Sequence, residues 1–272
     1  MAVVNAPKEL TVSLLVAYSS RKTFRAGLTE EERRASLLCS SHLRLNGRGI
    51  GRLSHLDMCP NARVLYAFDN LIEDLSPACD AKLLESIYAQ NNLISSVPAN
   101  LGAMLPNLTR LYLNGNMISM FTGWSGVGSP ALEELHLADQ RGSADGIAFD
   151  SDTLVSLSKS LKVLDISGNK LQSLSFLTGL NSLETLLADS NDLSDTEDLI
   201  TFLSSNPSLK MVSFKENAVS LASSAFRDAV VLVCPHLEFF NGKSVSSSER
   251  EFVKRKAVHN TALQSLIGNV TY

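Results

Sequence analysis

Apolar residues recur along most of this chain in one arrangement, and an asparagine follows them at a fixed distance. The clearest copy covers residues 108–118 and reads L-T-R-L-Y-L-N-G-N-M-I, with its asparagine at Asn116. The alternation around Leu111 and Leu113 predicts a short strand that has one buried face. One such strand cannot bury its leucines alone, so the copies are expected to stack into a continuous core.

Further copies of this pattern precede and follow the clearest one. Their asparagine position holds Arg48, Asn70, Asn92, Gln140, Asn169, Asn191 and Asn217. Asn70 and Asn92 are 22 residues apart. The pattern L-x-x-L-x-L-x-x-N-x-I is the signature of a leucine-rich repeat, and so short a period leaves room for a strand and a tight, mostly 3₁₀ return. We therefore predict an α/β fold over residues 37–219, a right-handed leucine-rich repeat solenoid of about eight 22-residue repeats.

Helical segments are predicted at both ends of the solenoid. Residues 1–36 are expected to form an N-terminal helical cap, because they contain an amphipathic stretch and then Thr29, an N-cap residue followed by three glutamates. Residues 220–245 are expected to form a C-terminal cap, in which Pro235 ends a helix before a closing strand. Residues 246–272 are predicted to be a C-terminal helix and tail. One side of that helix is expected to carry Phe252, His259, Leu263 and Ile267.

Two places interrupt the rhythm of the repeats. Extra residues between Gln140 and Leu161 predict a surface loop and then a short helix on one rim. The single tryptophan, Trp124, follows the fourth repeat, and we expect it to pack under a widened return because tryptophan is mostly buried.

The residues between the core leucines are the candidates for binding a partner. Side chains alternate across a strand, so these positions are expected to face the concave surface of the solenoid. Tyr66, Tyr88 and Tyr112 would form a ladder there, and exposed aromatic residues in a row are typical of protein interfaces. The alternative is that the rings stack only to cover the sheet. The candidate partner-binding residues are Arg44, Tyr66, Phe68, Tyr88, Gln90, Arg110, Tyr112, Glu134, His136, Asp165 and Asp189.

Charge and cysteine content narrow the class of partner. The chain has 24 basic and 28 acidic side chains, which argues against a surface that tracks phosphates, so no direct nucleic-acid contact is expected. No apolar run reaches the roughly 20 residues needed to cross a bilayer. The four cysteines include no C-x-x-C pair, which favours free thiols and a cytoplasmic location.

Motifs that would indicate catalysis are incomplete. The S-x-x-K match at residues 156–159 lacks its companion motifs, and the P-loop-like ending at residues 241–244 lacks its first glycine. The histidines show no metal spacing. His136 has acidic neighbours, yet an open strand surface is expected to be poor at shifting pKa values. We expect a monomeric protein that is not an enzyme and holds neither metal nor cofactor.

Three stretches carry a resemblance to a known family. They are E-E-L-H-L-A-D-Q-R within residues 132–141, the inserted F-D-S-D-T-L-V-S-L-S-K-S-L at residues 149–161, and L-E-F-F-N-G-K-S-V at residues 237–245. Over approximately residues 10–257 the chain resembles the SDS22-like leucine-rich repeat family and, within it, regulatory subunits of protein phosphatase 1. Asn241 stands where the family's cap commonly has aspartate.

The resemblance implies a non-catalytic adaptor with a protein partner. That partner would be the protein phosphatase 1 catalytic subunit, or tubulin or a motor protein at the cytoskeleton, centrosome or basal body. A ribonucleoprotein component that binds an RNA-binding protein is a further alternative. The K-x-V-x-F match at residues 210–214 fits a phosphatase-docking peptide, but Val212 and Phe214 occupy core positions and are expected to be buried.

Overall fold

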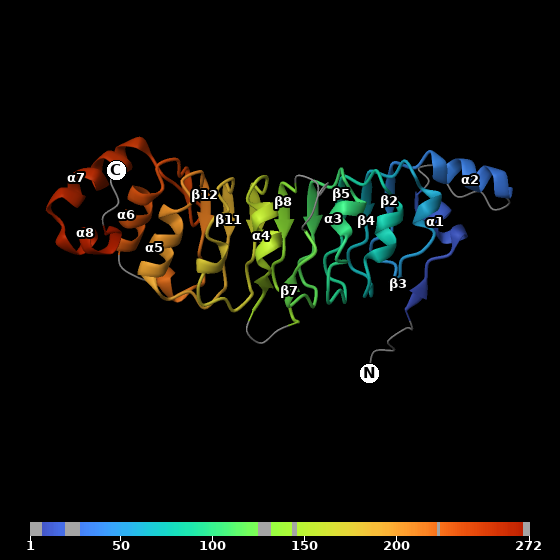
Figure 1. The fold of residues 1–272 in the computed structure, drawn as a ribbon, viewed down its shortest axis with the longest axis horizontal. Coiled ribbons are helices and arrows are strands. Elements are labelled where there is room, and N and C mark those ends of the chain that lie inside the picture. The colour runs from blue at the N-terminus through green and yellow to red at the C-terminus, as the bar shows by residue number, and fades with distance from the viewer. Residues whose placement is uncertain (1–6, 20–27, 125–131, 143–145, 222–223, 269–272) are drawn as a thin grey trace.

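A ten-stranded sheet runs the length of the molecule in a computed structural model that describes residues 7–19, 28–124, 132–142, 146–221 and 224–268. Neighbouring strands are parallel except for the last pair, which is antiparallel. Figure 1 shows the strands side by side along the long axis, with α1 and α2 at one end and α6, α7 and α8 at the other. The chain therefore advances by one strand per repeat.

The elements are short and have the following bounds. The main sheet consists of β2 (His42–Arg44), β4 (Val64–Tyr66), β5 (Ser86–Tyr88), β6 (Arg110–Tyr112), β8 (Glu134–His136), β10 (Val163–Asp165), β11 (Thr185–Leu187), β12 (Met211–Ser213), β13 (Phe239–Phe240) and β14 (Lys243–Ser244). Two small parallel pairs are β1 (Lys8–Glu9) with β3 (Ile50–Arg52) and β7 (Met120–Phe121) with β9 (Ala148–Phe149). The α-helices are α1 (Val12–Ser19), α2 (Glu30–Leu38), α3 (Leu101–Met104), α4 (Ser151–Leu157), α5 (Thr196–Ser204), α6 (Ser224–Val233), α7 (Ser247–His259) and α8 (Thr261–Ile267). The 3₁₀ helices are η1 (Leu56–Met58), η2 (Ser76–Asp80), η3 (Ser175–Leu177) and η4 (Ala218–Leu221).

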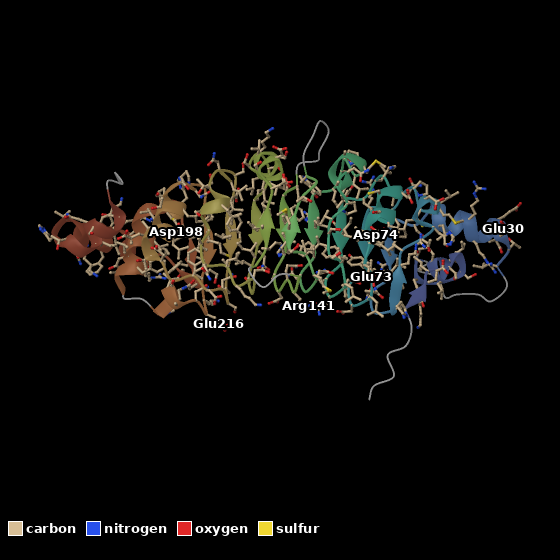
Figure 2. All side chains as sticks on the ribbon, turned by 60° about the horizontal axis from the view of Figure 1, so that its bottom comes forward. Glu30, Glu73, Asp74, Arg141, Asp198 and Glu216 are labelled. Atoms are coloured by element: carbon tan, nitrogen blue, oxygen red, sulfur yellow. The ribbon has the colours of Figure 1, made fainter. Side chains whose placement is uncertain are left out.

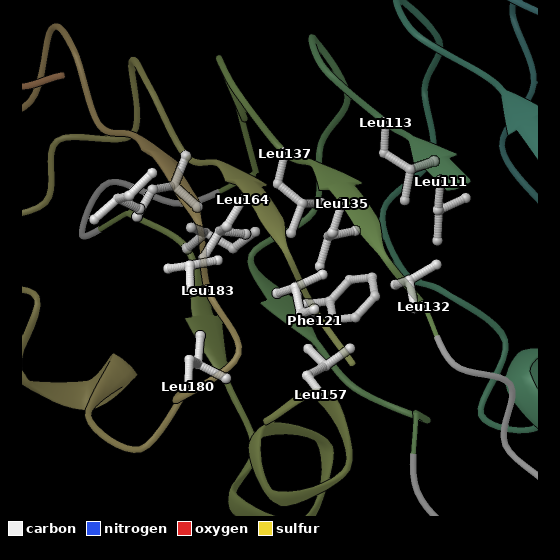
Figure 3. Packing of buried hydrophobic residues seen from close by; sticks show 14 of the residues in the cluster. Leu111, Leu113, Phe121, Leu132, Leu135, Leu137, Leu157, Leu164, Leu180 and Leu183 are labelled. Carbon is white, nitrogen blue, oxygen red and sulfur yellow. The ribbon is translucent and has the colours of Figure 1, made fainter. Parts of the chain in front are cut away.

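The recurring leucines form the core, as their period predicts. Leu111 and Leu113 are fully buried, and so are their counterparts in the neighbouring repeats, Leu135 and Leu137. Figure 3 shows these side chains in successive layers on one side of the sheet. Each layer fills the space beside the next, so burial of the leucines depends on the adjacent repeat.

The recurring asparagine ties each repeat to the one before it. Asn116 is fully buried, and its Nδ2 donates to the carbonyls of Ala89 and Leu113 at 2.9 and 2.8 Å. Its Oδ1 accepts from the backbone N–H of Ile94 at 3.1 Å. One side chain thus makes hydrogen bonds to three backbone groups that are buried at the ends of the strands.

Gln140 performs the same task in the fifth repeat. Its Oε1 accepts from the N–H of Ile118 at 3.0 Å, and its Nε2 donates to the carbonyls of Leu113 and Ala138 at 2.8 and 3.2 Å. A carboxamide on a longer side chain therefore continues the row of hydrogen bonds. In the first repeat Arg48 does not join this row through its side chain, and its N–H instead donates to Oδ1 of Asn70 at 3.0 Å.

The returns on the other side of the sheet vary in form. The four 3₁₀ helices η1 to η4 agree with the predicted tight returns. The return after Asn191 is different, because α5 is an α-helix of nine residues. Asp195 caps that helix by accepting from the N–H groups of Glu197 and Asp198. The prediction of mostly 3₁₀ returns is wrong for this repeat and for the return after Asn92, which contains the short α-helix α3.

The predicted insertion contains helix α4 and also strand β9, which the sequence did not indicate. Asp150 caps α4 by accepting from the N–H of Thr153 at 2.9 Å. Strand β9 of the insertion pairs with β7, and the two form a small sheet separate from the ten-stranded one. Trp124 is buried against Phe121, with ring centroids 6.3 Å apart, which confirms the expected burial of the tryptophan.

Two helices cover the first repeat. Thr29 and Glu32 form a capping box at the start of α2, because each side chain accepts from the other residue's backbone N–H. Helix α1 lies against β2, and its Leu15 is fully buried. Leu10 is also buried, but it precedes the helix rather than lying on its face. The predicted cap also includes residues 1–6 and 20–27, which lie outside the described residues.

The C-terminal end has two helices where the sequence predicted one. Asn260 ends α7 and also caps α8, since its Oδ1 accepts from the N–H of Leu263 at 3.0 Å. The predicted side is wrong at Phe252 and His259, which are both exposed, whereas Leu263 and Ile267 on α8 are buried. Val253 and Ala257 face the core instead. The predicted tail at residues 269–272 lies outside the described residues.

Candidate partner-binding face

The side of the sheet away from the leucine core is open to solvent, and we call it the open sheet face. The predicted binding residues are on or beside the strands of this face. Arg44 and Arg110 are exposed, while the half-buried members are Tyr66, Phe68, Tyr88, Gln90, Tyr112, Glu134, His136 and Asp189. Asp165 departs from the expectation because it is only 9% exposed. A protein partner could reach most of these side chains without any change in the fold.

The tyrosine ladder predicted from the sequence is a continuous stack of rings. Tyr66 and Tyr88 have ring centroids 5.1 Å apart, and Tyr88 and Tyr112 have them 4.7 Å apart. His136 continues the row at 4.2 Å from Tyr112, and His42 lies at its other end, 6.4 Å from Tyr66. We call these five side chains the aromatic stack.

The sheet register produces this stack. Tyr66 is opposite Tyr88, Tyr88 is opposite Tyr112, and Tyr112 is opposite His136 in successive parallel strands. Parallel neighbours lie about 4.8 Å apart, which suits stacked aromatic rings. Because each ring face lies against the next ring, the stack offers mainly ring edges and phenol oxygens to solvent. The place of His42 in the stack was not predicted, since it lies two positions before Arg44 in the repeat pattern.

A hydrogen-bonded trio lies beside the centre of the stack. The Tyr112 hydroxyl donates to Oε2 of Glu134 at 2.6 Å, and Nε of Arg110 donates to Oε1 of the same carboxylate at 3.1 Å. Burial raises the pKa of Tyr112, and the hydrogen bond to Glu134 raises it further. Burial alone would raise the pKa of Glu134, but the bonds from Tyr112 and Arg110 outweigh burial and lower it. The carboxylate therefore stays charged and fixed in position.

Asp165 lies next to the end of the stack, opposite His136 on the neighbouring strand. Its Oδ2 lies 3.5 Å from Nδ1 of His136, and its Oδ1 accepts from the N–H of Ser167 at 3.1 Å. Burial raises the pKa of Asp165, yet the hydrogen bonds from His136 and Ser167 more than offset it, so the pKa is lowered. The expectation that an open strand surface would be poor at shifting pKa values is therefore wrong here. Asp165 therefore holds the ring of His136 in place, and its largely buried carboxylate is poorly accessible to a partner.

Carboxylates gather along the rim where the strands end. Asp139, Asp189 and Glu216 follow β8, β11 and β12 in this row, and Figure 2 places Glu216 on the same edge of the molecule as Arg141 and Glu73. None of the three carboxylates has an ion-pair partner among the described residues. These three carboxylates make the rim of the C-terminal half of the open sheet face acidic.

Other candidate sites were sought in the described part of the chain. It contains no group of three or more histidine, cysteine or acidic side chains that could hold a metal ion, and no helix long and apolar enough to span a membrane. Val212 and Phe214 of the K-x-V-x-F match are fully buried, which confirms that this segment is part of the core. It cannot act as a docking peptide while the repeat is folded.

Comparison with known proteins supports the same fold. The family model for "Leucine Rich repeats (2 copies)" matches residues 82–126. An internalin C2 from Listeria monocytogenes is similar over 76% of this chain and 84% of its own, with 24% identity and a TM-score of 0.58. An internalin inlF from the same organism matches 76% of this chain and 55% of its own, with 20% identity and a TM-score of 0.55. This chain thus spans about half the length of inlF. The chain has a leucine-rich repeat fold, and leucine-rich repeat proteins generally act as scaffolds for protein–protein interaction.

Proposed function

We propose that this protein is a non-catalytic scaffold that binds a protein partner on its open sheet face, with the aromatic stack as the centre of the contact. The observation that carries the proposal is the row of stacked rings on an open surface. Packed rings lose little conformational freedom on binding, so contacts to their edges cost less entropy than contacts to free side chains. Tyrosine also combines apolar area with a polar tip, which suits an interface.

The polar groups in the stack are available to a partner. Among the described residues, nothing hydrogen-bonds the hydroxyls of Tyr66 and Tyr88, whereas the hydroxyl of Tyr112 is bound to Glu134. Oε1 of Gln90 also has no partner within the described part of the chain, although it is buried. Arg44 is exposed and makes no ion pair with a described residue. The N-terminal half of the face therefore offers two tyrosine hydroxyls and an arginine side chain for hydrogen bonds to a partner.

The finer proposal is an adaptor of protein phosphatase 1 at the cytoskeleton, in the cytoplasm or near centrosomes and basal bodies. It rests on the resemblance of residues 132–141, 149–161 and 237–245 to SDS22-like regulatory subunits of that phosphatase. The related alternative is an axonemal or basal-body protein that binds tubulin or a motor protein. We also propose that residues 37–219 form one solenoid of about eight repeats with capped ends, and that the chain is monomeric.

The experiment is a binding measurement with purified protein phosphatase 1 catalytic subunit and purified tubulin. The double variant Tyr66→Ala with Tyr112→Ala should weaken binding of the true partner at least about tenfold, because it removes two rings from the stack. Tyr66→Phe with Tyr88→Phe keeps the stack and removes only two hydroxyls, so it should have the smaller effect. Tyr18→Phe, on helix α1, is the matched control and should bind as the wild type does.

The results separate the parts of the proposal. Unchanged binding by the alanine double variant, with its circular dichroism spectrum preserved, would refute the aromatic stack as the contact surface. Failure of the wild-type protein to bind the phosphatase would refute the phosphatase adaptor. Binding of tubulin instead would support the alternative. Affinity purification from native cells, scored for phosphatase against tubulin peptides, tests the same choice independently.

A further inference from the structure

A second surface lies on the open sheet face at its C-terminal end. Met211 on β12 and Phe239 on β13 are opposite each other in the sheet and are 38% and 39% exposed. Leu187 on the preceding strand, β11, is half-buried on the same face and is opposite Ser213, so it lies diagonally from Met211. We call these three side chains the C-terminal apolar patch. Such side chains on adjacent strands of an open face indicate a surface that a partner covers.

The acidic rim borders this patch. Asp189 lies two positions after Leu187 along its strand, and Glu216 follows the end of β12. Oδ1 of Asp189 accepts from the N–H of Lys215 at 2.8 Å, and Oε2 of Glu216 accepts from the Ser190 hydroxyl at 2.6 Å. These contacts orient both carboxylates, and neither has an ion-pair partner among the described residues. Both carboxylates can therefore pair with basic side chains of a partner.

The buried hydroxyl of Ser213 lies between the C-terminal apolar patch and the acidic rim. Ser213 is two positions after Met211 on the same strand, so its side chain faces the same side of the sheet. It is only 5% exposed, and its Oγ has no hydrogen-bond partner within the described residues. Buried polar groups usually have a hydrogen-bond partner, so this hydroxyl, like the exposed apolar side chains and the unpaired carboxylates, indicates that a partner protein covers this surface.

The spacing of the strands determines which secondary structure fits across them. Adjacent strands are about 4.8 Å apart, and one turn of an α-helix advances about 5.4 Å. A helix laid across β11, β12 and β13 would therefore place about one apolar residue per turn on each strand. An extended peptide repeats its same-side residues every 6.6–6.8 Å or so, and its side chains would lose register with the strands. The patch suits a helix better.

From this geometry we propose that the C-terminal apolar patch binds an amphipathic, basic helix of a partner protein. The apolar stripe of that helix covers Leu187, Met211 and Phe239, and its lysine or arginine side chains pair with Asp189 and Glu216. The inference rests on the proposed scaffold function and adds a contact separate from the aromatic stack.

The test uses an 18-residue fluorescent peptide with leucine at helical spacing and lysine elsewhere, measured by fluorescence anisotropy with the full chain. A peptide of the same composition with strictly alternating leucine and lysine controls for charge. The variant Met211→Ser with Phe239→Ser removes the exposed apolar area. The variant Asp189→Asn with Glu216→Gln removes charge but keeps both hydrogen-bond acceptors. Phe252→Ser with Glu251→Gln, on the exposed side of α7, is the control for surface position.

The helical peptide should bind the wild type, and each patch variant should weaken that binding about tenfold or more. Raising the salt concentration should weaken binding to the wild type more than to the Asp189→Asn, Glu216→Gln variant. Equal binding by the alternating peptide, or by the patch variants, would overturn the proposal, as would no binding by the wild type. Tyr66→Ala with Tyr112→Ala should leave this peptide's affinity unchanged, so failure of the patch and failure of the aromatic stack are distinguishable.

Discussion

Replacing Asn116 by alanine tests whether the row of carboxamides holds the repeats together. The side chain makes hydrogen bonds to the backbone of Ala89, Leu113 and Ile94. Losing these bonds does not have the same cost in free energy for all three. The carbonyl of Ala89 keeps a bond from Asn92 Nδ2, and that of Leu113 keeps one from Gln140 Nε2. The N–H of Ile94 loses the acceptor that Asn116 supplies and is left buried.

The expected magnitude follows from this difference. A buried N–H without a partner costs about 1–3 kcal/mol, and each of the two other lost bonds costs about 0.5–1.5 kcal/mol. Asn116→Ala should therefore lower the free energy of unfolding by about 2–6 kcal/mol. This is a large part of the 5–15 kcal/mol or so that is typical of folded domains.

Chemical denaturation followed by circular dichroism measures the change. Asn107→Ala is the matched control, because Asn107 is exposed and its side chain makes no hydrogen bond with a described residue. The control should stay within about 0.5 kcal/mol of the wild type. A loss of less than about 1 kcal/mol in Asn116→Ala would refute the reasoning, because it would mean that the N–H of Ile94 finds another partner without cost.

Two further predictions concern titratable groups. The lowered pKa of Asp165 means that its carboxylate stabilises the fold above its unfolded pKa of about 3.9, and that this contribution is lost as pH falls through the lower folded pKa. Asp165→Asn should therefore be about 1–3 kcal/mol less stable at pH 7 and show a shallower loss of stability in acid, measured by denaturation across pH; an unchanged acid limb would contradict this. Burial raises the pKa of both Cys59 and Cys234 to about 12. A thiol reagent at pH 7.5 should therefore label the exposed Cys39 at least about a hundredfold faster than either buried cysteine, as measured by mass spectrometry of the native protein. Equal labelling rates would contradict the burial of these two thiols.

The periodic part of the molecule could be predicted from the sequence because one short pattern determines both faces of each strand. Alternation around Leu111 places the leucines in the core and Tyr112 on the open face, and repetition at 22 or 24 residues brings Tyr88 and Tyr112 together. Asn116 was predictable for the same reason, since a polar residue at a fixed position after buried leucines must satisfy backbone groups. The leucine-rich repeat fold thus follows from local pattern and stacking.

The structure departs from the sequence-based predictions at positions where contacts with other repeats or helices determine which side chain is buried. Asp165 occupies a face position in the pattern, but His136 and Ser167 bury it and hold it in place. On α7 the helical period is compatible with more than one apolar side, and packing on α6 selects Val253 rather than Phe252. Asn260 falls within the single helix that the sequence predicts, although its short carboxamide side chain is suited to capping the next helix.

The regular spacing of the strands also sets the distance between the two proposed binding surfaces. His136 at the end of the aromatic stack and Leu187 in the C-terminal apolar patch lie on strands separated only by β10, so about 10 Å of sheet lies between the two surfaces. Each added or deleted repeat would change that distance in steps of about 4.8 Å and leave the chemistry of either surface intact. The count of repeats, which the asparagine row keeps in register, can therefore select partners by the spacing of their own contact points.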